Sequence, residues 1–139
     1  MHDPFNLRRF VSAQDPVFDR VLTELRDGQK RSHWMWFVFP QIQGLGHSEI
    51  SRRYAITCRA EADAYLHHPV LGPRLEACTQ LVNATDGRSA YDIFGSPDNM
   101  KFHSCMTLFA AVSPDDSIYS QALRRYFAGS PDPATVDRL

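Results

Sequence analysis

Apolar residues recur at intervals of three and four along four stretches of the chain, which is the spacing of one face of an α-helix. Each stretch follows a residue able to cap a helix and a proline, an arrangement typical of a helix start. These starts are Asp15-Pro16, His68-Pro69, Ser96-Pro97 and Ser113-Pro114, and Gly28 and Asp86-Gly87 mark the ends of the first two stretches. The pattern predicts long helices over residues 17–25, 71–82, 100–112 and 118–127.

Shorter stretches with the same spacing predict helices over 7–13, 49–56, 60–66 and 89–94. The aromatic block 33–40 stands alone without a strand partner, so we expect a short buried helix that ends at Pro40. No two alternating apolar and polar runs are joined by a hairpin turn. We therefore predict an all-α fold with no substantial sheet, formed by one domain over 1–139 whose last eleven residues are a loop with a short final turn.

Composition narrows the classes of protein to be considered. A net charge of −1 argues against a general nucleic-acid-binding protein, which needs a basic excess. No apolar run approaches the roughly 20 residues that cross a membrane, and the N-terminus lacks the features of a signal peptide. Cys58, Cys78 and Cys105 are odd in number and widely spaced, which favours buried free thiols over disulfides or zinc ligands. We expect a cytoplasmic protein that binds neither membranes nor metals and needs no cofactor.

Several stretches of the sequence resemble one family along most of the chain. The tryptophan block 30–41 is the most specific of them. The resemblance continues through 3–11, 44–48, 53–56, 68–75, 93–95 and 106–109, with Asp98 and Lys101. The chain is similar in these stretches to the bacterial family known as domain of unknown function 1810. That resemblance implies a compact, mainly helical fold, and it implies no reaction.

One position departs from the pattern of that family. Its members tend to carry two serines before the Met-Thr-Leu-Phe stretch, whereas this chain carries Ser104 and Cys105. A chemical role that required a hydroxyl at the second position would be impaired here.

A glycine-containing segment offers the clearest candidate for a binding site. Gly44 and Gly46 let the backbone approach a ligand closely, and Ser48 is a suitable N-cap for the helix that follows. Free N–H groups at a helix start attract anions, and arginines add paired donors. The alternative is that the glycines only form a turn and that the basic residues are a solvated surface. The segment predicts an anion site formed by Arg31, Trp34, Gln41, Gly44, Gly46, Ser48 and Arg53.

Trp34 and Trp36 provide flat surfaces on which a base or sugar ring stacks. Paired tryptophans in an apolar run are more often core residues. Residues two apart on a helix diverge by about 200°, so at most one of the two indoles faces a given pocket. We expect one tryptophan in the core and leave the other open.

Catalytic candidates are fewer. His33, His47 and His103 lie in the family-like stretches, and a histidine there acts as a general base near neutral pH. Lys101 and Ser104 are three residues apart and share one face of the predicted helix over 100–112, which forms either a solvent face or the wall of a cleft. His33, Lys101 and Ser104 are the candidates for chemistry, and His67-His68 is expected to have a capping or surface role.

Two hypotheses of different classes follow. The first is a helical protein that binds a small anionic metabolite bearing phosphate or carboxylate, with or without turnover. The second is a non-catalytic interaction module or homodimer that uses an exposed patch of its nine phenylalanines, five tyrosines and two tryptophans. A concave basic pocket near Trp34 and Gly44 favours the first, and a flat apolar patch favours the second.

Overall fold

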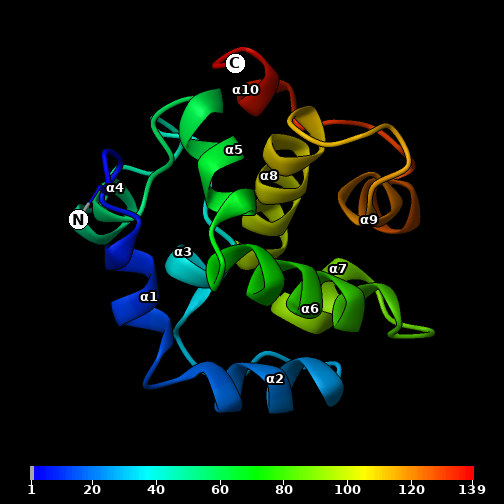
Figure 1. Ribbon diagram of the computed structural model, residues 1–139. Helices are drawn as coiled ribbons and strands as arrows, with labels where there is room; N and C mark the ends of the chain where they lie inside the picture. Colours follow the sequence, from blue (N-terminus) through cyan, green and yellow to red (C-terminus); the bar gives the residue numbers. More distant parts are fainter. Residues whose placement is uncertain (1) are drawn as a thin grey trace.

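The computed structural model describes residues 2–139, and within that range all regular structure is helical (Figure 1). The helices are α1 (Arg8–Gln14), α2 (Phe18–Arg26), α3 (Met35–Val38), α4 (Glu49–Arg53), α5 (Arg59–His67), α6 (Leu71–Asn83), α7 (Ala90–Phe94), α8 (Asp98–Ala111), α9 (Ile118–Phe127) and α10 (Pro133–Val136). The prediction of an all-α fold is confirmed.

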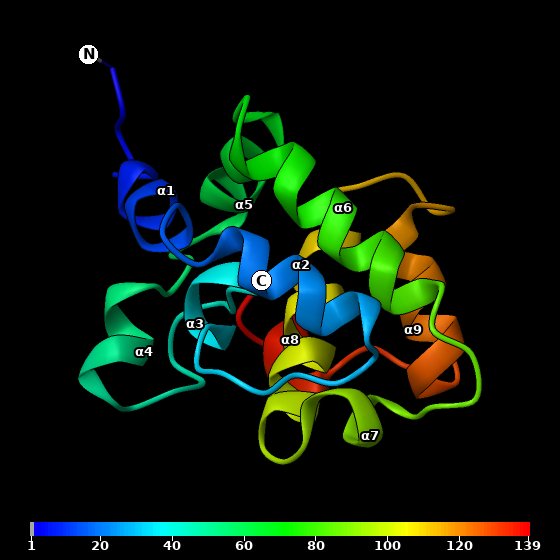
Figure 2. The same cartoon turned by 90° about the horizontal axis from the view of Figure 1, so that it is seen from below.

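Helix α8 is the centre of the molecule and packs against α5, α7, α9 and α10. Helix α6 packs in turn against α2, α5 and α9. Helix α4 lies at one edge, on the side away from α9 (Figure 2). The core is aromatic at its centre, where the ring of Phe102 stacks on Phe94 at 4.7 Å and meets Phe39 edge-on at 5.2 Å.

Three of the residues expected to cap a helix, Asp15, Ser96 and Ser113, are not the N-caps of α2, α8 and α9. Asp15 is the C-cap of α1 and does not cap α2, because α1 continues to Gln14. The buried side-chain amide of Gln14 donates to the Phe37 carbonyl at 2.7 Å. Helix α8 begins after Pro97 without a side-chain cap. Helix α9 begins at Ile118, as predicted, but its N-cap is Ser117, which accepts a hydrogen bond from the Ser120 backbone N–H. A proline signal therefore marks the turn before a helix here, not its first residue.

The capping role expected of the histidine pair is confirmed for His68, whose Nδ1 accepts from the backbone N–H groups of Val70 and Leu71 ahead of α6. Cysteine burial is confirmed for Cys78 and Cys105, but Cys58 is exposed. The prediction for Cys58 was wrong because this residue lies in the turn before α5, outside the apolar face.

Glu24 fixes the start of the tryptophan block. Its carboxylate, 5% exposed, accepts from the backbone N–H groups of Arg31 and Ser32, from the Ser32 hydroxyl at 2.6 Å and from the Trp34 indole N–H at 2.9 Å. Burial raises the pKa of the Glu24 carboxyl, but these hydrogen bonds outweigh it and lower the pKa from an ordinary 4.5 to about 2. The carboxylate is therefore charged at neutral pH, and it holds the start of α3 in place.

Candidate functional site

The segment from Gln41 to Thr57 forms a loop whose two ends are joined. Ile42 and Ile56 form an isolated parallel bridge, in which Gln43 N donates to the Ile56 carbonyl and Ile56 N donates to the Gln41 carbonyl, both at 2.8 Å. Both isoleucines are buried, which ties the base of the loop to the core. The predicted helix over 49–56 therefore ends at Arg53, because Ile56 pairs with Ile42 instead of continuing α4.

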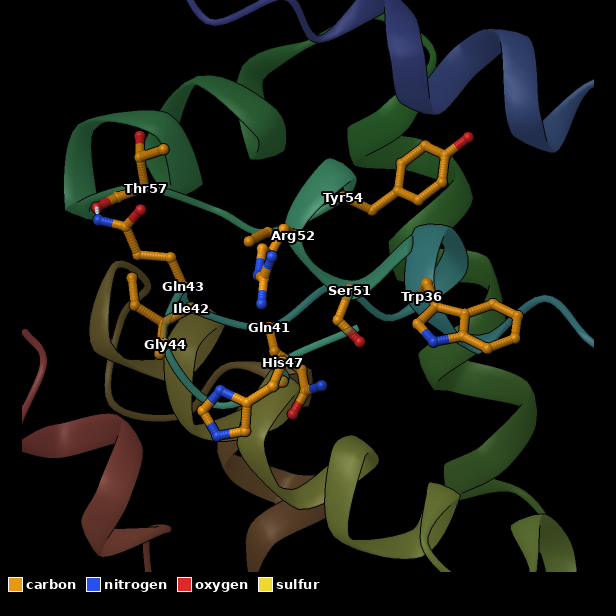
Figure 3. A pocket seen from close by; sticks show the side chains of 12 residues that line it. Trp36, Gln41, Ile42, Gln43, Gly44, His47, Ser51, Arg52, Tyr54 and Thr57 are labelled. Carbon is orange, nitrogen blue, oxygen red and sulfur yellow. Dashed lines mark hydrogen bonds between the residues drawn. The ribbon is translucent and has the colours of Figure 1, made fainter. Parts of the chain in front are cut away.

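This loop lines a partly open cavity of about 360 Å³, which we call the loop cavity (Figure 3). Apart from Trp36, every residue that lines it comes from the loop itself. Figure 3 shows the side chain of Arg52 between Gln43 and Ser51, with the imidazole of His47 at the near side. The lining residues are Trp36, Gln41, Ile42, Gln43, Gly44, Gly46, His47, Ser51, Arg52, Tyr54, Ala55 and Thr57.

The two glycines are required by the shape of the loop. Gly44 has a φ of +95°, which residues with a side chain rarely adopt, and Arg138 packs onto it with Nη2 donating to the Gly44 carbonyl at 3.3 Å. A Cβ on Gly46 would lie 2.6 Å from both Cβ and Oγ of Ser51. Gly46 therefore lets Ser51 come close enough to close the wall of the cavity.

Helix α4 supplies the charge of the site through its side chains. Ser48 is its N-cap, as predicted, and accepts from Ser51 N at 3.2 Å. With only five residues the helix has too few aligned peptide dipoles to form an anion site at its N-terminus. The cationic group at the loop cavity is instead the guanidinium of Arg52.

Arg52 and Arg53 differ in their surroundings although they are adjacent. Arg53 pairs with the exposed carboxylate of Glu49 at 3.6 Å and lies outside the loop cavity. The Arg52 side chain has no ion-pair partner among residues 2–139. No aspartate or glutamate of this described range lines the loop cavity. The lining thus combines an unpaired cation with neutral hydrogen-bonding groups.

A buried ion pair anchors the far end of the loop. Glu61, 1% exposed, accepts from Arg9 Nη2 at 3.0 Å, and its other oxygen accepts from the backbone N–H and the hydroxyl of Thr57 at 2.9 and 2.8 Å. The Arg9 guanidinium also donates to the carbonyls of Arg53 and Ala55, at 2.7 and 2.8 Å. Arg9 and Glu61 together hold the C-terminal end of α4 against α1 and α5.

Four of the predicted ligand-binding residues do not line the loop cavity. Arg31 is exposed and pairs with Asp27 at 3.0 Å. Trp34 is 1% exposed, and its indole N–H is bound by Glu24, so its ring belongs to the core. Ser48 and Arg53 belong to the loop without lining the cavity. Of the predicted set, Gln41, Gly44 and Gly46 do line it, and Trp36 is the tryptophan that reaches it.

The catalytic candidates are not brought together at the loop cavity. Lys101 and Ser104 line a smaller neighbouring cavity of about 280 Å³, which we call the second cavity. His33 is exposed and lines neither the loop cavity nor the second cavity. His103 stacks on the ring of Phe127 at 4.0 Å, and its Nε2 lies 2.8 Å from the Ser130 carbonyl oxygen. Within residues 2–139 the Ser104 hydroxyl donates to the Met100 carbonyl and to Asp132, and neither Lys101 nor a histidine is hydrogen-bonded to it.

Cys105, where the family pattern has serine, belongs to α8 and is fully buried in the core. Burial raises the pKa of its thiol well above the usual range. It lines neither the loop cavity nor the second cavity. The departure from the pattern therefore affects packing and not the candidate site.

Apart from Tyr91, the aromatic residues are buried in the core or packed against it. Among the phenylalanines, tyrosines and tryptophans, all of which lie within residues 2–139, only Tyr91 is exposed, at 62%. The exposed aromatic patch expected for an interaction module is therefore not present. Binding of a second copy or of another protein stays a prediction. No helix over 2–139 combines the length and apolar character needed to cross a membrane.

Comparison with known proteins agrees with the resemblance in the sequence. The crystal structure of the conserved hypothetical protein Rv1873 from Mycobacterium tuberculosis is similar, with a TM-score of 0.97 and 52% identity over 99% of this chain and 98% of that chain. No curated protein matches the chain. A model of the family described as "Protein of unknown function (DUF1810)" matches residues 4–139. The chain belongs to this family.

Proposed function

We propose that this protein binds a small molecule carrying a phosphate or carboxylate group in the loop cavity. The observation that carries the proposal is the guanidinium of Arg52, which lines the cavity without an ion-pair partner among residues 2–139. A guanidinium offers several N–H donors in one plane, a geometry that matches both phosphate and carboxylate oxygens.

The rest of the lining supports a polar anion over a purely apolar ligand. Gln41, Gln43 and Ser51 supply two amides and a hydroxyl that donate to the oxygens of an anion, whereas the Thr57 hydroxyl already donates to Glu61. Trp36 adds an aromatic wall for the body of the ligand. A volume of about 360 Å³ falls within the range of small-molecule sites, roughly 300–1,000 Å³.

A thermal-shift screen with inorganic phosphate, pyrophosphate, citrate and phosphorylated sugars tests the proposal. Ligand at about 100 times its dissociation constant adds roughly 2.7 kcal/mol to the free energy of unfolding. We expect at least one anion to raise the unfolding temperature, with chloride at equal ionic strength as the control. Absence of any shift across the whole panel would count against an anion site.

Arg52→Ala is expected to weaken binding of the best anion about 10- to 100-fold, since a charge-assisted hydrogen bond contributes roughly 1.5–3 kcal/mol. Calorimetric titration measures the change. Arg53→Ala is a matched control, because it removes the same side chain from the next position of the same helix, outside the cavity. Equal losses in the two variants would indicate a general effect of surface charge and would contradict the proposal.

A further inference from the structure

The second cavity adjoins the loop cavity. Gln41 and Gly46 line both cavities. Lys101, in the wall of the second cavity, lies with Nζ 5.1 Å from the ring centroid of Trp36, which is in the wall of the first. A ligand held at Arg52 therefore has a neighbouring space of about 280 Å³ beyond Gln41.

Asp132 gives this second cavity a fixed carboxylate. Its Oδ2 accepts from the hydroxyls of Ser104 and Thr135, at 2.8 and 2.6 Å, and its backbone N–H donates to Thr107 Oγ1 at 2.9 Å. No side chain within residues 2–139 donates a hydrogen bond to Oδ1. Desolvation raises the pKa of the Asp132 carboxyl, but the bonds from Thr135 and Ser104 outweigh it and lower the pKa. Oδ1 is thus the oxygen of this charged carboxylate that receives no hydrogen bond from another side chain of residues 2–139.

A donor accompanies this acceptor. The ammonium group of Lys101 lies 3.5 Å from Asp98, a long ion pair that leaves N–H groups for another partner. A fixed acceptor beside a donor is complementary to hydroxyl groups, which accept and donate at once. A second anion would be repelled by Asp132, and a cation by Lys101. Neutral hydroxyls satisfy both groups.

We propose that the anionic ligand is a phosphate ester of a polyol, such as a sugar phosphate, with its phosphate at Arg52 and its hydroxyls at Asp132 and Lys101. This inference rests on the proposed function, because the phosphate end occupies the loop cavity. It adds a ligand class and assigns a specificity role to Asp132, which lies 80 residues from Arg52 in the sequence.

Two matched probes test the inference by calorimetric titration. Ethyl phosphate carries the charge alone, and ribose 5-phosphate adds hydroxyls. The wild-type protein is expected to bind ribose 5-phosphate about tenfold more tightly than ethyl phosphate, because one to two additional hydrogen bonds contribute roughly that gain in affinity. A parallel titration with adenosine 5′-monophosphate distinguishes a nucleotide from a free sugar phosphate. Tighter binding of either compound than of ethyl phosphate supports the inference if the difference depends on Asp132.

Asp132→Asn is expected to abolish this preference while leaving ethyl phosphate affinity within twofold of wild type. The amide oxygen can still accept from Ser104 and Thr135, but an NH₂ donor then replaces the free acceptor. Lys101→Met, which leaves Asp132 in place, is expected to reduce the preference as well. Equal affinity of the wild type for both probes would overturn the inference and leave the proposed function standing. No binding of either probe would overturn the inference and the phosphate part of the proposed function, and the citrate titration then decides its carboxylate part.

Discussion

Replacing Glu61 with alanine is expected to lower the free energy of unfolding by roughly 3–5 kcal/mol. The substitution leaves the guanidinium of Arg9 without its carboxylate partner and the Thr57 backbone N–H without an acceptor. Both losses occur at a carboxylate that is 1% exposed, where water does not replace the missing partner. Urea denaturation followed by circular dichroism measures the change.

Glu49→Ala is the control for this prediction. Glu49 forms an ion pair with Arg53 at 3.6 Å, but both side chains are exposed, so its loss is expected to change stability by no more than about 0.5 kcal/mol. A cost below about 1 kcal/mol for Glu61→Ala would show that the Arg9–Glu61 pair does not anchor the loop.

Glu24→Gln is expected to destabilise the protein by roughly 3 kcal/mol at neutral pH. This is the free energy that corresponds to a carboxyl pKa lowered from 4.5 to about 2 by hydrogen bonding in the folded state. The stabilisation is fully present above the pKa of the unfolded chain and is lost as the pH falls from 4.5 towards 2. Urea denaturation of both proteins at several pH values gives the comparison.

The gap in stability between wild type and Glu24→Gln should narrow by roughly 2 kcal/mol between pH 7 and pH 3, because glutamine does not titrate. Asp3, Asp92 and Asp132 also have lowered pKa values, but they are present in both proteins and cancel in the difference. A gap that stays constant with pH would mean that the Glu24 carboxylate is not the group responsible.

The long helices were predictable because each buries a continuous apolar face. Their capping residues were less predictable: Ser117 caps α9, whereas Ser113-Pro114 is the more conspicuous signal in the sequence. Which serine caps a helix depends on where the preceding turn docks against the core, and the local pattern does not contain that information.

The candidate site was predicted in part for a similar reason. Residues three and four apart share a helix face, so Ser48, Ser51 and Arg52 lie on one side of α4. This spacing is the feature of the sequence that points to Arg52, and not Arg53, as the arginine at the cavity. Trp34 was assigned to the site, but Glu24, ten residues earlier, holds its indole in the core. Glu61 and Asp132 reach the loop region through tertiary contacts, and no local signal identified them.

The two tryptophans provide the most direct test of anion binding at the loop cavity. In a titration of ¹⁵N-labelled protein with inorganic phosphate, then with citrate, the indole N–H signal of Trp36 and the amide signals of Gly44 and Gly46 are expected to shift and saturate. The Trp34 indole signal is the internal control and should not move, because that group is buried and donates to Glu24. Signals that stay in place with both anions, or shifts confined to residues that do not line the loop cavity, would contradict the proposal.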